Sequence, residues 1–159
     1  MKSVSIVLTI FLAIIMCNCA GTVRPGYDAD DEQSREYVFS TQLSKLDEYN
    51  NALIYISNIY NSANSVIQLK DPNAGVIVVK AQCPFNIMGY TRYVYYTMEA
   101  RFKDQKAKIT FNLSGIAGGG GFYAQPDYAP PKEQMPYVWN NLDDIASGLK
   151  SAMQKKDDF

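Results

Sequence analysis

The sequence predicts an α+β fold, a β-α-β-β-β-β-α two-layer sandwich in which an antiparallel sheet carries two helices on one face. Residues 45–60 and 139–153 repeat apolar side chains every three or four positions, which is typical of amphipathic helices. Residues 92–103 alternate apolar and polar side chains, which is typical of a strand with one buried face. A chain of 159 residues has room for one domain with its own core.

The first predicted elements are a short strand at residues 36–40 and the helix that follows it. Ser44 and Asp47 are placed like the start of a capping box, so the helix is expected to begin after Ser44. Spacings of three and four then mark one apolar face. That face is expected to consist of Leu46, Tyr49, Leu53, Ile56 and Tyr60.

Two further strands are expected after this helix. They are residues 66–70 and the β-branched run at residues 76–82, and the turn sequence Asp71-Pro72-Asn73 separates them. The second of these strands is expected to be buried. Residues 84–89 are expected to form a connecting loop.

A long hairpin contributes the last two predicted strands. The chain turns at Asp104-Gln105 and returns over residues 107–113. The first strand of the hairpin is expected to pack one face on the core and to expose the other. The inward face is expected to be Val94, Tyr96, Met98, Ala100 and Phe102, and the outward face Tyr93, Tyr95, Thr97, Glu99, Arg101 and Lys103.

A long loop and a second helix complete the predicted domain. The loop, residues 115–136, contains the glycine run Gly118–Gly121 and four prolines. Neither a P-loop nor a dinucleotide-binding fingerprint fits this context, so we expect no nucleotide cofactor. The closing helix is expected to pack Trp139, Leu142, Ala146, Leu149 and Met153 against the sheet.

Composition and charge exclude several classes of function. The chain has 15 basic and 16 acidic side chains, and the first twenty residues contain one of the lysines and no acid. This balance does not favour binding to nucleic acid, which requires clustered cations. The chain has no histidine, which excludes Ser-His-Asp and Cys-His catalysis and every histidine-ligated metal site. Without such a base, Cys83 is expected to be a small buried apolar residue, and we expect neither a catalytic site nor a metal.

The first twenty residues have the pattern of an export signal. A short positively charged start, Met1-Lys2-Ser3, precedes thirteen uncharged and mostly apolar residues, 4–16. As a helix they would extend about 20 Å, which is less than the ~30 Å hydrocarbon core of a membrane. The segment therefore predicts a signal peptide rather than a membrane span.

Cys17 and Cys19 at the end of this segment predict a lipid-attachment site. A lipobox places an aliphatic residue three positions before the modified cysteine and a small residue directly before it. Cys19 follows Met16-Cys17-Asn18 and precedes the small pair Ala20-Gly21, whereas Cys17 directly follows the bulky Met16. We expect lipidation at Cys19, with Cys17 as the alternative. Ordinary secretion, with cleavage after Ala20 or Gly21, is the other possibility.

Residues 21–35 are expected to form a flexible acidic tether between the signal and the domain. They contain Asp28, Asp30, Asp31 and Glu32 and few apolar side chains. The glycine and the distal glutamate of a calcium loop are missing, so no calcium site is expected. The predicted organisation is a signal peptide at 1–20, a tether at 21–35 and a domain at 36–155.

Two stretches of the domain resemble a known family. Residues 65–77, S-V-I-Q-L-K-D-P-N-A-G-V-I, have the pattern of a strand, a turn and a strand that follows a glycine, and the hairpin at 93–113 ends in K-A-K-I-T-F-N-L. Both resemble a bacterial family of domains of unknown function with a TATA-box-binding-protein-like (TBP-like) fold. The resemblance implies that fold and an exported, commonly lipid-anchored, location in the cell envelope. It implies no catalytic residue, because the family has no established activity.

Exposed aromatic side chains are the candidate binding residues. Tyr93 and Tyr95, together with Tyr90, are expected on the open face of the sheet, and Phe122 and Tyr123 in the glycine-rich loop. Aromatic side chains often anchor interfaces. The alternative is that the tyrosines stabilise the sheet by packing across the strands.

Three functions agree with these observations. We favour a non-enzymatic envelope protein that is lipid-anchored in the membrane, faces the periplasm or the cell surface, and binds a partner protein or a ligand through the open sheet face or loop 115–136. Without the lipid, it would be a soluble secreted or periplasmic protein. The second function is a structural component of a surface assembly, in which the sheet pairs with another chain. The third is a hydrolase, which is disfavoured because Glu99 lacks a second acid and is expected to pair with Arg101.

Overall fold

The computed structural model describes residues 33–87, 89–117, 124–125 and 130–155. The predicted signal peptide with Cys17 and Cys19, the acidic residues 28–32, and Phe122 and Tyr123 lie outside these ranges. Within them, no helix is both long and apolar enough to cross a membrane. The elements are β1 (Ser34–Ser40), α2 (Lys45–Ile59), α3 (Ala63–Val66), β2 (Ile67–Asp71), β3 (Val76–Ile87), β4 (Tyr90–Lys103), β5 (Lys106–Ala117), β6 (Ala124–Gln125), the 3-10 helix η1 (Lys132–Gln134) and α4 (Met135–Met153).

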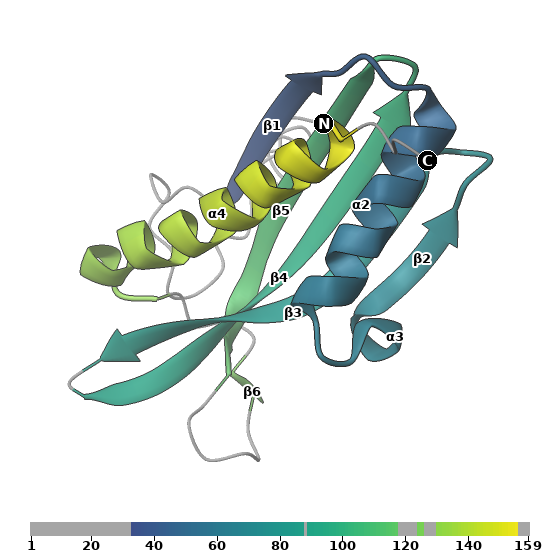
Figure 1. Cartoon of the computed structure of the whole chain (residues 1–159). Helices are drawn as coiled ribbons and strands as arrows, with labels where there is room; N and C mark the ends of the chain where they lie inside the picture. Colours follow the sequence, from purple (N-terminus) through teal and green to yellow (C-terminus); the bar gives the residue numbers. More distant parts are fainter. Residues whose placement is uncertain (1–32, 88, 118–123, 126–129, 156–159) are drawn as a thin grey trace, which may run out of the picture.

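The strands form one antiparallel sheet in the order β1-β5-β4-β3-β2, with β6 beside the end of β5. The central strand, β4, pairs with β3 and β5 along most of its length, so that Met98 lies opposite both Val79 and Phe111. The first strand of the chain, β1, lies at one edge of the sheet and pairs with β5. Figure 1 shows α2 and α4 side by side on one face of the sheet. The predicted two-layer α+β fold is therefore confirmed.

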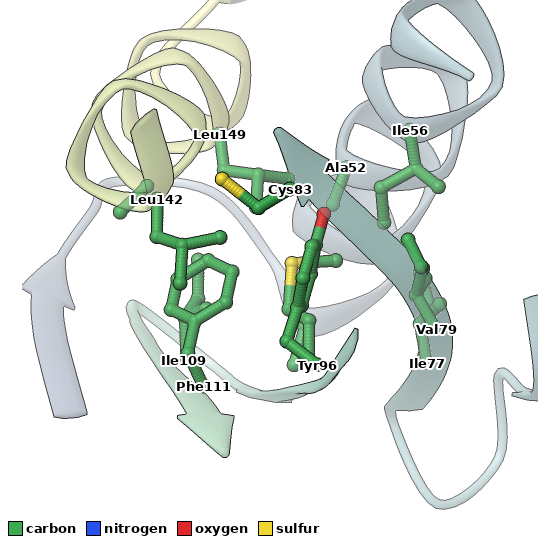
Figure 2. Packing of buried hydrophobic residues seen from close by; sticks show 14 of the residues in the cluster. Ala52, Ile56, Ile77, Val79, Cys83, Tyr96, Ile109, Phe111, Leu142 and Leu149 are labelled. Carbon is green, nitrogen blue, oxygen red and sulfur yellow. The ribbon is translucent and has the colours of Figure 1, made fainter. Parts of the chain in front are cut away.

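The core lies between this sheet and the two helices. The predicted inward face of β4 is buried, and its five side chains, from Val94 to Phe102, are each no more than 2% exposed. In Figure 2, Leu142 of α4 faces Ile109 and Phe111 of β5. The period-two pattern of β4 therefore places one continuous row of apolar side chains beneath the helices.

The buried face of α2 differs in part from the prediction. Ser44 caps the helix and accepts a hydrogen bond from the backbone N–H of Asp47, as expected. Tyr49, Ala52 and Ile56 are buried, but Leu46 is 54% exposed, so its predicted place in the core is wrong. Ala52, which was not part of the predicted face, is buried, so the buried face of α2 is rotated away from Leu46.

Strands β3 and β5 extend several residues beyond their predicted ends. β3 continues to Ile87, so residues 84–87 belong to a strand and not to the expected connecting loop. Pro84 is tolerated there because β2 pairs with β3 only as far as Val79, which leaves Pro84 on an edge. β5 continues to Ala117, beyond the predicted end at Leu113.

The first strand and the last helix of the domain also begin earlier in the sequence than predicted. β1 begins at Ser34, so Ser34 and Arg35 belong to the sheet and not to the tether. α4 begins at Met135, with Pro136 in its first turn, where the missing N–H of proline costs no helical hydrogen bond. A one-turn helix, α3, was not predicted and includes Val66. The buried face of α4 matches the prediction and contains Trp139, Leu142, Ala146, Leu149 and Met153.

A polar cluster connects the edge strand β1 to α4. The guanidinium of Arg35 lies 4.5 Å from the centre of the Trp139 ring and forms an ion pair of 3.0 Å with Asp143. The hydroxyl of Tyr37 also donates to Asp143. Burial, followed by the contact with Asp143, raises the pKa of Tyr37 to about 12. The cluster therefore holds β1 under α4 with charge-assisted contacts in addition to its pairing with β5.

Among the residues that the structure describes, Glu48 of α2 is the one buried acidic side chain. The Thr41 hydroxyl donates to Oε1 of Glu48, and Oε2 has no hydrogen-bond partner. Burial raises the pKa of Glu48; the Thr41 hydrogen bond opposes this to a smaller extent, and the nearby Asp104 adds the smallest effect, a further increase. The ionised form is therefore disfavoured in the folded chain.

Replacement of Ile56 by alanine should destabilise the chain, whereas the same replacement of Ile54 should not. Both residues are in α2, but Ile56 is 0% exposed and Ile54 is 59% exposed. Ile56→Ala should lower the free energy of unfolding by about 2–5 kcal/mol, because it removes buried methyl groups and leaves a cavity. Ile54→Ala, the matched control, should change it by less than about 0.5 kcal/mol. Urea unfolding of both variants tests this, and equal losses would contradict the assignment of the buried face.

Glu48→Gln should stabilise the folded chain increasingly as the pH rises. Because the pKa of Glu48 is raised in the folded state, that state binds more protons than the unfolded state above the ordinary glutamate pKa. Glu48 therefore makes stability fall as the pH rises from its unfolded to its folded pKa. Urea unfolding between about pH 4 and pH 8 should show a difference between the Glu48→Gln and wild-type chains that grows with pH. A difference that is independent of pH would contradict the burial of this carboxyl group.

Candidate functional site

Two β-bulges interrupt the regular pairing of the sheet. Between β2 and β3, Ile67 pairs with Val79 and Leu69 with Val78, so Gln68 is an extra residue. Between β4 and β5, the pairing shifts at Tyr95 and Tyr96, and Ser114 is the extra residue. Bulges bend a strand and redirect side chains, and they are frequent beside functional sites.

Gly115 makes the second bulge possible. It lies directly opposite Tyr95 and has a φ of 121°, which is in the region that favours glycine. Gly115 is itself buried although it lies on the outer face of the sheet. Any residue with a side chain would be strained at this position, so the glycine allows β5 to continue beyond the bulge.

The two bulged residues, Gln68 and Ser114, line the same pocket. The pocket has a volume of about 610 Å³ and lies beside the part of β3 that β2 leaves unpaired. Strand β4 contributes side chains from both of its faces. The lining residues are Tyr60, Ser65, Val66, Gln68, Lys80, Ala81, Gln82, Tyr95, Tyr96, Thr97 and Ser114.

A pair of tyrosine hydroxyls connects this pocket to the core. The hydroxyl oxygens of Tyr60, at the end of α2, and Tyr96, in β4, lie 2.5 Å apart. Burial raises the pKa of each of these tyrosines. Both hydroxyls therefore stay protonated near neutral pH and are available as hydrogen-bond donors or acceptors.

The pocket has the chemistry of a binding site. Lys80 is its one charged lining residue, and the other polar groups are hydroxyls and the amides of Gln68 and Gln82. These groups can hold an anionic or hydrogen-bonding ligand, and the ring of Tyr95 can pack against it. Two carboxylates, which acid–base hydrolysis of a glycoside would need, are not among the lining residues.

Cys83 does not provide a nucleophile. It is 3% exposed, and its sulfur lies 3.8 Å from the backbone oxygen of Val138 in the core. Burial raises the pKa of its thiol. The thiol therefore stays protonated, which agrees with the apolar role that the sequence predicts. Among the described residues, no group of three or more cysteine and acidic side chains is placed to hold a metal ion.

The predicted tyrosines are only partly gathered at one site. Tyr93 and Tyr95 lie on the outer face of β4, and Tyr93 is 40% exposed while Tyr95 is half-buried. Tyr95 lines the pocket, whereas Tyr93 lies two residues away along the strand. Tyr90 is three residues from Tyr93, so its side chain projects from the opposite face of β4. The prediction that Tyr90 lies beside Tyr93 and Tyr95 is therefore wrong. The expected ion pair between Glu99 and Arg101 is present.

Several pocket residues are not predicted by the sequence. Its patterns place Tyr60 on the apolar face of a helix and Lys80 in a buried strand. The bulge at Ser114 has a local signal in the sequence, because the next residue is Gly115 and a glycine within a strand often marks a bulge. The other residues meet because β2 and α3 pack beside β3, which sequence periodicity does not reveal.

The sheet order and the two helices on one face define a two-layer α+β protein (Figure 1). Residues 35–113 match the family described as a domain of unknown function (DUF4468) with TBP-like fold. This part of the chain is similar to the DUF4468 family, and solved structures share its fold.

Two solved structures illustrate the likeness. A DUF4468 family protein from Bacteroides ovatus ATCC 8483 is 14% identical, with a TM-score of 0.55, and the match covers 84% of this chain and 93% of that one. A TBP-like protein from Parabacteroides distasonis ATCC 8503 is 13% identical, with a TM-score of 0.51, over 74% of this chain and 92% of that one. At these identities the likeness concerns the fold alone. No curated protein sequence matches the chain.

Proposed function

We propose that this chain is an exported, lipid-anchored protein of the bacterial cell envelope that binds a partner or ligand at the Tyr95 pocket without catalysing a reaction. The proposed anchor is a lipid on Cys19, with Cys17 as the alternative. The pattern of residues 1–20, a charged start followed by a short apolar run and cysteines, supports export and lipidation. A lipid would attach the domain to the membrane without a spanning helix.

One observation supports binding most directly: the extra residues of two separate bulges, Gln68 and Ser114, line a single pocket. Each bulge interrupts the regular backbone hydrogen bonding between two strands, and the second bulge also requires a glycine at position 115. A fold without a binding role would gain stability from uninterrupted strands. Because bulges are over-represented next to functional sites, two bulges that line one pocket support a binding role for it.

The chemistry of the pocket favours binding over the two other functions. The lining includes Lys80 but no carboxylate, which disfavours acid–base hydrolysis. The unpaired part of β3 is also a poor site for assembly by strand addition. That edge contains Pro84, which cannot donate a backbone hydrogen bond to an added strand.

Lipid attachment predicts a specific mass for the mature protein. The full chain, expressed in its bacterial host, should fractionate with membranes and have the mass of an acylated chain that starts at Cys19. Cys19→Ser should release an unacylated chain, and the control Cys17→Ser should not. A lipid-free mass with a start at Gly21 or Thr22 would contradict the anchor and indicate a secreted or periplasmic protein.

Binding at the pocket predicts position-dependent crosslinks in intact cells. The photo-reactive residue p-benzoylphenylalanine, placed at position 93, should form an adduct, because this position adjoins the pocket on the outer face. A second substitution, Tyr95→Ala, should reduce the yield by roughly tenfold or more, as expected for an aromatic anchor. It should change the free energy of unfolding by about 1 kcal/mol or less, because Tyr95 is only half-buried.

The matched control for this experiment is position 137. Tyr137 of α4 is 62% exposed and does not line the Tyr95 pocket. The adduct formed at position 93 should keep its yield in a Tyr137→Ala chain. Equal losses in the two variants, or unfolding of Tyr95→Ala, would mean that the tyrosine serves the fold and not the binding site.

A further inference from the structure

Strand β1 forms an open edge of the sheet. It is the outermost strand on one side, and within the described residues it pairs with β5 alone (Figure 1). The carbonyl of Gln33 accepts a hydrogen bond from the N–H of Leu113, and the N–H of Thr41 donates to the carbonyl of Gln105. Because such bonds alternate along an antiparallel pair, every second residue of β1 directs its backbone groups away from β5. These residues are Ser34, Glu36, Val38 and Ser40.

This edge lacks the features that usually keep two sheets from associating. Proteins protect an edge strand by short length, a bulge, a proline or an exposed lysine. β1 has seven residues, pairs with β5 without a shift in register, and contains neither proline nor lysine. Its two charged residues are already compensated, Arg35 by Asp143 and Glu36 by Lys108. The apolar Val38, in the second half of the strand, is 52% exposed.

The opposite edge of the sheet, β2, has these protective features. It is five residues long, contains the exposed Lys70 and has its bulge at Gln68. Pro72 follows directly after its last residue. Of the two edges, β1 is therefore the one suited to pair with a further strand.

Two aromatic side chains on the inner face of β1 are only half-buried. The rings of Tyr37 and Phe39 are stacked, with their centres 6.3 Å apart. Helix α4 contacts both of them, because Tyr37 donates to Asp143 and the amine of Lys150 lies 5.8 Å from the centre of the Phe39 ring. A strand added to β1 would place its own side chains beside these rings and bury them further.

A second copy of β1 fits this edge in an antiparallel register. A two-fold axis at Val38 places Val38 opposite its own copy, Tyr37 opposite Phe39, and Glu36 opposite Ser40. The residues with outward backbone groups then face one another, which allows about six backbone hydrogen bonds between the copies. The pairing buries the exposed valines and the aromatic rings, and it opposes no like charges.

Charge distinguishes this register from its two neighbours. An axis at Tyr37 would bring Asp143 beside its own copy, and an axis at Phe39 would do the same for Lys150. Both arrangements place like charges together, which is costly at an interface. With the axis at Val38, Lys150 of each copy instead approaches Asp143 of the other, because Phe39 lies opposite Tyr37.

We propose that this chain forms a two-fold symmetric dimer by antiparallel pairing of β1 with β1 of a second copy, with the axis at Val38. A second copy is the occupant because the edge complements itself in backbone direction, apolar side chains and charge. The dimer depends neither on lipidation nor on the proposed binding function. None of the residues that line the Tyr95 pocket belongs to β1, so each copy would keep its pocket.

A charge placed on the axis tests the proposal. The full chain, purified in a non-ionic detergent with micelles in excess of protein, should sediment as a dimer in analytical ultracentrifugation. Val38→Lys should weaken dimerisation by roughly tenfold or more, because two ammonium groups then lie opposite each other. Val38→Glu should weaken it for the same reason. An equimolar mixture of the two variants should dimerise again, which a general effect on folding would not produce.

Leu69→Lys is the matched control. Leu69 is an apolar residue of the other edge strand, β2, and is 47% exposed. The replacement adds the same charge to an edge of the same sheet, and it should leave the dimer unchanged. Equal weakening by Val38→Lys and Leu69→Lys would indicate that net charge, and not the β1 edge, governs association.

A disulfide between two different chains tests the register. Glu36→Cys and Ser40→Cys chains, distinguished by affinity tags, should form a mixed disulfide when they are oxidised together, because opposed Cα atoms lie about 5.5 Å apart. Neither variant should form a disulfide-linked dimer alone through the new thiol. A monomeric wild-type chain, no recovery in the mixture of charged variants, or disulfides within one variant instead of between the two would each overturn the proposal.

Discussion

The fold depends on burial of the inner face of its central strand. β4 contributes Tyr96, Met98 and Phe102 to a row that α2 and α4 cover, and burial of each large side chain contributes about 1.5–3 kcal/mol. β3 and β5 pair with β4 in a register that brings their own apolar residues to the same face. A shift of one residue would turn the whole row toward water, so this row fixes the pairing of all three strands.

The two bulges are tolerated because this row is continuous without them. Ser114 and Gln68 are extra residues, yet Leu113 still lies opposite Tyr96, and Ile67 still lies opposite Val79. Close α2–α4 packing also limits where the helices can lie. At Gly148 of α4, a Cβ atom would overlap the hydroxyl of Tyr55 in α2. The inward register of the central strands is therefore kept, and the extra residue of each bulge lines the pocket.

The outer face carries charge because no helix covers it. Water can solvate cations there, so Lys103 and Lys106 can lie opposite each other at a modest cost. On the inner face, water cannot solvate a charged side chain in this way. Glu48 of α2, a buried carboxyl group on the side of the sheet that the helices cover, has a raised pKa because burial disfavours its ionised form. Of the two faces of the sheet, the outer one therefore carries the exposed charges.

The sequence determined the elements whose signals are periodic and local: the face of β4, the buried face of α4, the Ser44 cap and the two-layer fold. These follow from side-chain geometry within one strand or helix. Tertiary structure decided the exposure of Leu46, the strand at Pro84 and the meeting of Gln68, Lys80, Tyr95 and Ser114 in one pocket. Each depends on contacts between segments distant in sequence, such as the end of β2 beside β3. Tyr95 was predicted as a site residue from its exposed strand position, but its neighbours in the pocket come from packing that no local pattern encodes.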